Sequence, residues 1–187
     1  MLQLGLRPRS VQADLQSFKC MILYEEIFRA FQKQKVKYCL VGGIAVNLLG
    51  SLRSTADMDI LVEMSGENLR KVVSILKKKG YRVKQPVDPM GIADAKTRYD
   101  WIHNKHMKAF NFYKMDEMKE VDIIIESPVS FESAKKNVVL IKIDDVILPV
   151  ISITDLIKMK KAAGRGVDKL DIEELKKIRN LKRRNDL

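Results

Sequence analysis

Apolar side chains recur along the chain in patterns that predict helices alternating with short strands. Helical spacing over residues 18–34 predicts an amphipathic helix that covers one face of a sheet. A second helix is predicted between Ser65, a suitable N-cap, and Gly80, a suitable residue just beyond its C-terminus. Residues 92–105 are predicted to form a third helix. The apolar stripe of the second helix consists of Leu69, Val72, Val73 and Leu76.

Short apolar runs separated by polar turns predict the strands. Residues 107–113 and 120–126 form two such runs, joined by the polar turn at Asp116 and Glu117. Further runs at 138–143 and 146–151 flank Asp144-Asp145, which predicts a β-hairpin, and a short strand is expected at 81–83. With helices between them, these strands predict a mixed α/β domain.

The C-terminal part of the chain is predicted to be a helical hairpin. Ser152-x-x-Asp155 resembles a capping box and opens a helix that ends near Ala163. Gly164 and Gly166 break this helix, and a second one is expected from about residue 167 to 181.

The stretch 38–63 concentrates the candidate chemistry. An apolar run ends in Gly42-Gly43, a short helix follows to Gly50, and a second apolar run opens with Asp57-Met58-Asp59. Because alternate side chains of a strand share a face, Asp57 and Asp59 point the same way. Two close carboxylates repel each other unless a cation lies between them, so a divalent metal is the natural candidate.

These motifs resemble the nucleotidyltransferase superfamily, which includes polymerase-β-like palms, antibiotic nucleotidyltransferases and abortive-infection toxins. The resemblance rests on Gly42-Gly43, Arg53-Ser54-Thr55 and Asp57-x-Asp59, followed by Asp122 in a later apolar strand. It extends over about residues 37–178, because 156–175 is similar to a C-terminal helical segment of the minimal and toxin-like branches.

The resemblance implies a fold, a reaction and a metal. The fold is an α/β (α+β) mixed sheet with helices packed on it and the C-terminal hairpin partly covering the cleft. The reaction moves a nucleoside monophosphate from a nucleoside triphosphate to a hydroxyl and releases pyrophosphate. Two Mg²⁺ ions, which require oxygen ligands, would be held by the catalytic residues Asp57, Asp59 and Asp122.

Gly42 and Gly43 are the first candidates for phosphate binding. They would let backbone N–H groups approach a triphosphate at the N-terminus of the short helix, or they could simply make a tight turn. The superfamily often has Gly-Ser here, so Ser51, Ser54 and Thr55 remain alternative hydroxyl donors.

Several cations are further candidates for contacts with the substrates. Arg53 can reach a phosphate or pair with a carboxylate. Lys158 and Lys161 lie three apart on one helix face, and the resemblance suggests that one of them, with Lys158 preferred, neutralises the β- or γ-phosphate. Arg165 and Lys169 follow near the glycine turn and could contact the acceptor.

Charge favours an anionic acceptor. The 187 residues carry a net charge of +11 with a pI near 9.6, and 158–184 hold eleven Lys/Arg against four Asp/Glu, which is +7 of that excess. Such a surface repels a cationic aminoglycoside and attracts a phosphate backbone. An RNA acceptor is therefore predicted, with the 3′ end of a tRNA suggested by the toxin-like relatives. The residues expected to engage it are drawn from Lys176, Lys177, Arg179, Lys182, Arg183 and Arg184.

Three alternatives stay open at this point. The acceptor could be a non-cationic antibiotic such as a lincosamide, or a Tyr, Ser or Thr of a protein. The chain could also be a non-catalytic domain that binds nucleotide, RNA or a partner protein. The toxin-like branch further implies a neutralising protein partner.

The remaining signals divide the chain and place it in the cell. We expect a flexible arm over 1–17, a catalytic core over 18–151 and a basic helical segment over 152–187 packed on it. Cys20 and Cys39 lack the spacing of a disulfide framework or a metal site. Since no segment approaches 18 consecutive apolar residues, a cytoplasmic protein without membrane contact is expected.

Aromatic and histidine residues near position 100 offer weaker candidates. His103 and His106 lack a further ligand nearby and are interpreted as solvated. Tyr99 and Trp101 beside Arg98 could stack on a base or belong to the core.

Overall fold

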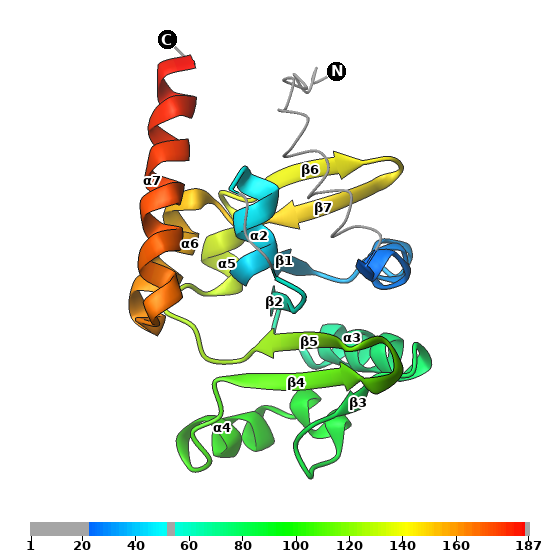
Figure 1. Cartoon of the computed structure of the whole chain (residues 1–187). Coiled ribbons are helices and arrows are strands. Elements are labelled where there is room, and N and C mark those ends of the chain that lie inside the picture. The colour runs from blue at the N-terminus through cyan, green and yellow to red at the C-terminus, as the bar shows by residue number, and fades with distance from the viewer. Residues whose placement is uncertain (1–22, 52–54, 186–187) are drawn as a thin grey trace.

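A computed structural model describes residues 23–51 and 55–185 as one mixed sheet with helices around it. The sheet has seven strands in the order β3-β4-β5-β2-β1-β7-β6. In Figure 1 the β6–β7 hairpin lies at one end and β4–β5 at the other, with β1 and β2 between them. The strands are β1 (Tyr38–Leu40), β2 (Met58–Val62), β3 (Arg82–Val83), β4 (Ala109–Lys114), β5 (Lys119–Ile124), β6 (Val139–Ile143) and β7 (Val146–Val150).

The predicted mixed character of the sheet is confirmed by its pairing. β2 runs antiparallel to β1 and parallel to β5, and β1 runs parallel to β7. The β3–β4, β4–β5 and β6–β7 pairs are antiparallel. The central strands β1 and β2 are therefore covered on both edges, which suits their almost uniformly apolar sequence.

The helices follow from local capping signals as well as from their apolar faces. They are a helix over residues 23–33, α2 (Gly42–Leu49), α3 (Gly66–Lys78), α4 (Ala95–His103), α5 (Phe131–Lys135), α6 (Ile153–Ala163) and α7 (Gly166–Asn185), with 3₁₀ turns η1 (Pro89–Ala93) and η2 (Met115–Glu117).

α3 shows how closely the sequence determines one of these helices. The Asn68 N–H donates to Ser65 Oγ at 3.3 Å, and Gly80 takes a φ of +83° just beyond the C-terminus. All four residues of the predicted apolar stripe are buried. The predicted bounds of this helix are therefore confirmed.

The C-terminal hairpin is also confirmed. Ser152 Oγ accepts a hydrogen bond from the Asp155 N–H, and Gly164, with φ +65°, ends α6. The following α7 lies beside α6 and α2 along one side of the molecule (Figure 1). No helix in the described part of the chain is both long and apolar enough to cross a membrane.

Two regions differ from the expectation. The single helix predicted over 92–105 is divided into η1 and α4, because the Asp94 side chain caps α4 by accepting from the Thr97 N–H. The five-residue α5 is not predicted by the sequence pattern, since so short an element has no readable periodicity. The predicted arm over 1–17 lies outside the described residues.

The aromatic residues near position 100 divide between core and surface. Trp101 is buried and stacks on Phe110 with ring centroids 5.0 Å apart, and Phe112 is buried as well. The suggested role of Trp101 in stacking on a base is therefore wrong, because core packing uses its ring. Tyr99 is exposed and stacks on His103 instead.

Candidate active site

Two aspartates lie side by side on neighbouring strands at the centre of the sheet. β2 and β5 pair in parallel with Asp59 directly opposite Asp122. Their flanking residues, such as Met58 and Val121, point to the other face and are fully buried. Alternation along both strands therefore brings the two carboxylates to the same face of the sheet.

Both carboxylates face an open cavity of about 670 Å³. Its walls come from the turn between β1 and α2, the start of β4, the loop after β5, and α6 with the α6–α7 turn. This size is typical of a small-molecule site. The charged and glycine residues that line it are Gly42, Asp59, Lys108, Asp122, Glu126, Lys160 and Arg165.

Both carboxylates have pKa values above the usual range of an aspartate. Burial, followed by the charges of Asp122 and Asp57, raises the pKa of Asp59 to about 6, although Arg165 and the Gly43 N–H act in the opposite direction. Burial also raises the pKa of Asp122, and a hydrogen bond from Asn111 partly offsets that shift. A cation bound between the carboxylates would relieve this repulsion.

The glycine pair allows the β1–α2 turn to pack directly against the aspartates. Gly42 has a φ of +63°, and a Cβ at this position would collide with the Asp59 carboxylate. A Cβ on Gly43 would lie 2.6 Å from Thr55 Oγ1, while its N–H donates to Asp59. The N-terminus of α2 thus lies at the cavity, where N–H groups that have no partner within the helix favour anions.

The hydroxyl candidates occupy different positions. Thr55 lies against Gly43 at the edge of this turn, whereas Ser51 is buried at the end of α2. Arg53 and Ser54 lie outside the described residues. Of Ser51 and Thr55, the two hydroxyl candidates within the described residues, Thr55 therefore has the better access to the glycine turn.

The lysines of α6 lie on different sides of the helix. Lys158, the preferred candidate, is exposed and pairs with Asp155 at 3.0 Å, and neither it nor Lys161 lines the cavity. Lys160 does line the cavity, and it is almost fully buried. Since it lies one turn after the buried Leu156, its position on the apolar face is a readable signal.

A buried ion cluster holds Lys160 between two aspartates of α7. Its amine lies 3.2 Å from an Asp168 oxygen and 2.6 Å from an Asp171 oxygen. Arg165 donates to Asp168 through Nε at 3.0 Å while its side chain stays largely exposed at the cavity. Asp168 and Asp171 are three apart on one face of α7, and the sequence pattern predicts no role for either.

The carboxylate oxygens of Asp59 and Asp122 at the base of the cavity suit Mg²⁺. This ion prefers oxygen ligands and keeps part of its coordination shell for water and substrate phosphates. Asp59 and Asp122 supply such oxygens from fixed strands, and Asp57 is exposed just before β2. Within residues 23–51 and 55–185, no three Asp, Glu, His or Cys side chains form a ready-made metal site. The protein thus offers carboxylates that fit an ion shared with a phosphate substrate.

The sequence matches the profile of a family described as uncharacterised nucleotidyltransferase, over residues 2–144. The chain belongs to this family. Its members transfer nucleotidyl groups, so this nucleotidyltransferase is an enzyme, and the matched range contains Asp57, Asp59 and Asp122 but not the α6–α7 hairpin. Comparison with curated protein sequences gives no match.

Solved structures share the fold of this nucleotidyltransferase. The lincomycin-bound lincosamide antibiotic adenylyltransferase LnuA is 20% identical with a TM-score of 0.58, covering 84% of this chain and 96% of LnuA. The antibiotic-resistance factor ANT(2'')-Ia is 15% identical in its solution structure with a TM-score of 0.52, covering 90% of this chain and 94% of that chain. At these identities the comparison confirms the mixed α/β fold.

Proposed function

We propose that this enzyme transfers a nucleoside monophosphate from a nucleoside triphosphate to a hydroxyl in a Mg²⁺-dependent reaction. The observation that carries the proposal is the register of Asp59 with Asp122 at the floor of the cavity. The site combines carboxylates for a cation, a helix N-terminus and three basic side chains, which together suit a triphosphate.

The carboxylates serve the nucleophile side of the reaction. Held by Asp59, Asp122 and Asp57, Mg²⁺ would stabilise the charge on the phosphates and on the attacking oxygen. The acceptor hydroxyl oxygen forms a bond to the α-phosphorus, and Asp122 accepts the hydroxyl proton. The bond from the α-phosphorus to the bridging oxygen breaks, and pyrophosphate leaves with that electron pair.

The opposite wall serves the leaving group. Arg165 projects from the α6–α7 turn and is exposed enough to swing from Asp168 onto a phosphate. Lys160 lines the same wall with its charge balanced by Asp168 and Asp171, and the Gly43 N–H donates to Asp59. Lys158 and Lys161 remain predicted phosphate contacts without a place in the cavity lining.

Pyrophosphate release tests this reaction. Asp59→Asn keeps the shape of the side chain and removes its charge, so we expect release to fall about 10²- to 10³-fold or more with an unchanged fold. Asp116→Asn, in the exposed turn η2, makes the same chemical change away from the cavity and should leave release unchanged. Equal rates in wild type and Asp59→Asn would overturn the assignment.

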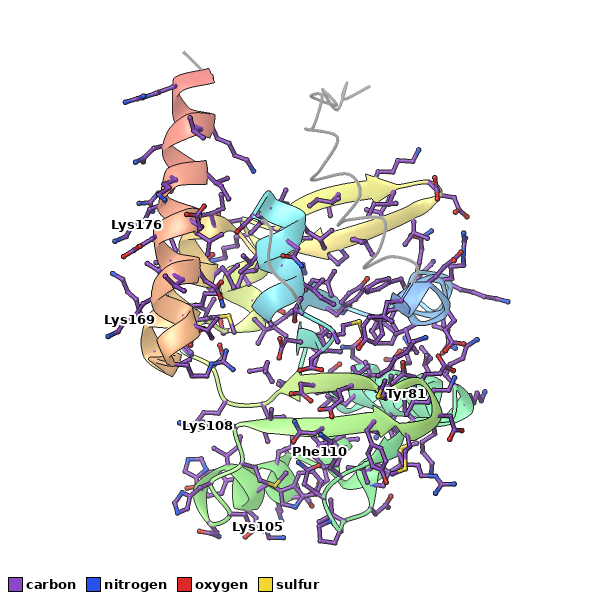
Figure 2. All side chains as sticks on the ribbon, in the orientation of Figure 1. Tyr81, Lys105, Lys108, Phe110, Lys169 and Lys176 are labelled. Atoms are coloured by element: carbon purple, nitrogen blue, oxygen red, sulfur yellow. The ribbon has the colours of Figure 1, made fainter. Side chains whose placement is uncertain are left out.

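We propose RNA as the acceptor because exposed cations follow the outer face of α7. Lys169 and Lys176 project outward from this helix in Figure 2. At the start of β4, Lys108 is exposed and lines the cavity. A phosphate backbone crossing from α7 to the cavity mouth would meet positive charge along this path.

Transfer from α-labelled triphosphates to total cellular RNA and to an antibiotic panel tests the acceptor. The double variant Lys169→Gln/Lys176→Gln should weaken RNA binding and reduce its salt slope by about one for each phosphate that the variant no longer neutralises. An antibiotic product without labelled RNA, or RNA affinity that does not fall as salt rises, would reject an RNA acceptor.

A neutral antibiotic is the second candidate acceptor. The observation in its favour is the shared fold with LnuA, a lincosamide antibiotic adenylyltransferase, over 96% of that chain. A small acceptor would need only the cavity itself and not the outer face of α7. In that case the double variant of α7 would leave transfer unchanged.

A further inference from the structure

A polar row crosses three strands beneath the cavity. Asn111 on β4 pairs in register with Asp122 on β5, which pairs in register with Asp59 on β2. The side-chain Nδ2 of Asn111 donates to Asp122 Oδ1 at 2.7 Å. Asn111 does not line the cavity, so it reaches the floor only through Asp122.

The orientation of the Asn111 amide is set by Gln85, in the loop after β3. Gln85 Nε2 donates to Asn111 Oδ1 at 2.6 Å, and the Asn111 N–H donates to Gln85 Oε1 at 3.3 Å. Both amides are half-buried. Because Gln85 occupies the carbonyl oxygen of the Asn111 side chain, the NH₂ group is the end that faces Asp122.

We infer that Asn111 is a positioning residue for Asp122 and that Gln85 fixes Asn111 in the orientation this role requires. The hydrogen bond holds one carboxylate oxygen of Asp122 toward β4, so the other oxygen is presented to the cavity. A neutral donor can do this without neutralising the charge that a cation needs. The relevance to catalysis rests on the proposed function, whereas the hydrogen-bond chain itself does not.

A reversed amide would have the opposite effect. If Asn111 turned by 180°, its carbonyl oxygen would face the Asp122 carboxylate, and repulsion would push that side chain out of position. Gln85→Glu imposes this reversal, because a carboxylate at position 85 cannot donate to Asn111 Oδ1 but can accept from Nδ2. The substitution acts two side chains away from the reacting atoms.

The Mg²⁺ affinity of Gln85→Glu distinguishes the positioning role from a simple effect of the added negative charge. An added negative charge near the site would by itself tighten cation binding. The positioning role predicts that Gln85→Glu weakens Mg²⁺ binding about tenfold, as substitutions behind a metal ligand commonly do. Asn111→Ala should weaken Mg²⁺ binding to a similar extent. Gln85→Met removes the hydrogen bonds that orient the Asn111 amide but does not force the amide to reverse, so its effect on Mg²⁺ binding should be smaller.

The experiment combines calorimetric Mg²⁺ titration with NMR of the Asn111 side-chain amide, on folded full-length variants. Gln32→Glu is the matched control, since this exposed amide bonds to the β6–β7 turn instead. We expect weaker Mg²⁺ binding and a shifted Asn111 amide signal in Gln85→Glu, with neither change in Gln32→Glu. Equal or tighter binding in Gln85→Glu would overturn the inference.

The NMR signal keeps this test separate from the proposed reaction. An Asn111 amide signal that does not respond to Gln85→Glu overturns the positioning role, whether or not the protein transfers nucleotides. If Gln85→Glu fails to fold, Gln85→Met provides the same two measurements. Pyrophosphate release that survives Asp59→Asn overturns the proposed function alone.

Discussion

The molecule contains two pairs of aspartates that differ in how their charge is balanced. On α7, Asp168 and Asp171 bracket the buried amine of Lys160, and Arg165 adds a second cation. On the sheet, Asp59 and Asp122 lie side by side. The positive charge of Arg165 lowers the pKa of Asp59 by Coulomb attraction, without a hydrogen bond between the two side chains. One pair is neutralised by the fold, whereas we propose that the other keeps its charge for a ligand.

The pKa values follow this difference. Burial alone would raise the pKa of Asp168, but the hydrogen bonds from Arg165 and Lys160 outweigh it and lower the pKa. At Asp59 burial acts with the repulsion of Asp122, and the pKa rises to about 6. The fold therefore stabilises the ionised form of Asp168 and destabilises that of Asp59, as expected if the first pair is structural and the second takes part in the proposed reaction.

The largest expected effect comes from removing the ion pairs that Asp168 and Asp171 of α7 make with Lys160. Lys160→Met removes the buried amine between Asp168 and Asp171 and leaves Arg165 as the cation beside Asp168, so the free energy of unfolding should fall by about 3–5 kcal/mol. Urea denaturation measures this loss. Lys161→Met, one residue on and exposed, should change it by less than about 0.5 kcal/mol. Comparable small effects in both variants would show that the cluster does not hold the hairpin.

The pair on the sheet, Asp59 and Asp122, should be sensitive to a substitution at Gly42, which packs against Asp59. Gly42→Ala places a methyl group against the Asp59 carboxylate in a backbone conformation with φ +63°, so we expect a loss of about 2 kcal/mol or more together with reduced activity. Thermal unfolding and pyrophosphate release measure the two losses. Gly166→Ala is the control, since a Cβ there meets nothing within 4 Å. A fully active Gly42→Ala variant would contradict the packing described for this turn.

Asp59 and Asp168 should affect the pH dependence of stability with opposite signs. The folded pKa of Asp59 is raised, so its ionisation costs stability, and that cost grows as pH rises from about 4 to about 6, by about 1–2 kcal/mol. The folded pKa of Asp168 is lowered, so its stabilisation is complete above about pH 4 and is lost as pH falls further. Urea denaturation of wild type and Asp59→Asn across pH 4–7 measures the first change. A difference between them that stays constant over this range would contradict the raised pKa.

The smallest effect is expected at Lys158. Its side chain is 60% exposed and its partner Asp155 keeps a hydrogen bond from the Ser152 hydroxyl, so Lys158→Ala should alter stability by less than about 1 kcal/mol. Because Lys158 does not line the cavity, pyrophosphate release should stay within about twofold. A large fall in release would instead support its predicted contact with a phosphate.

The sequence is sufficient for features that depend on local chemistry. The Ser65 cap, the Gly164 helix end and the alternation around Asp59 can all be read from neighbouring residues, and each is confirmed. The third aspartate, Asp122, is predicted to lie in a later apolar strand, and it does.

Features that depend on pairing between distant segments cannot be predicted in this way. The contact of Asn111 with Asp122 follows from the β4–β5 register, and that of Gln85 with Asn111 from the path of the chain after β3. The place of Lys160 on the apolar face of α6 can be read from the sequence, but its two aspartate partners cannot, because only the packing of α7 brings them to it. These contacts require the tertiary fold.

Calorimetry with a non-hydrolysable nucleoside triphosphate, with and without Mg²⁺, tests the contrast between the two pairs most directly. For wild type we predict that Mg²⁺ tightens binding by about tenfold or more, and that the gain is lost in Asp59→Asn and in Asp122→Asn. Asp116→Asn should keep the full gain. An undiminished gain in both sheet variants would contradict the claim that the sheet pair keeps its charge for a cation.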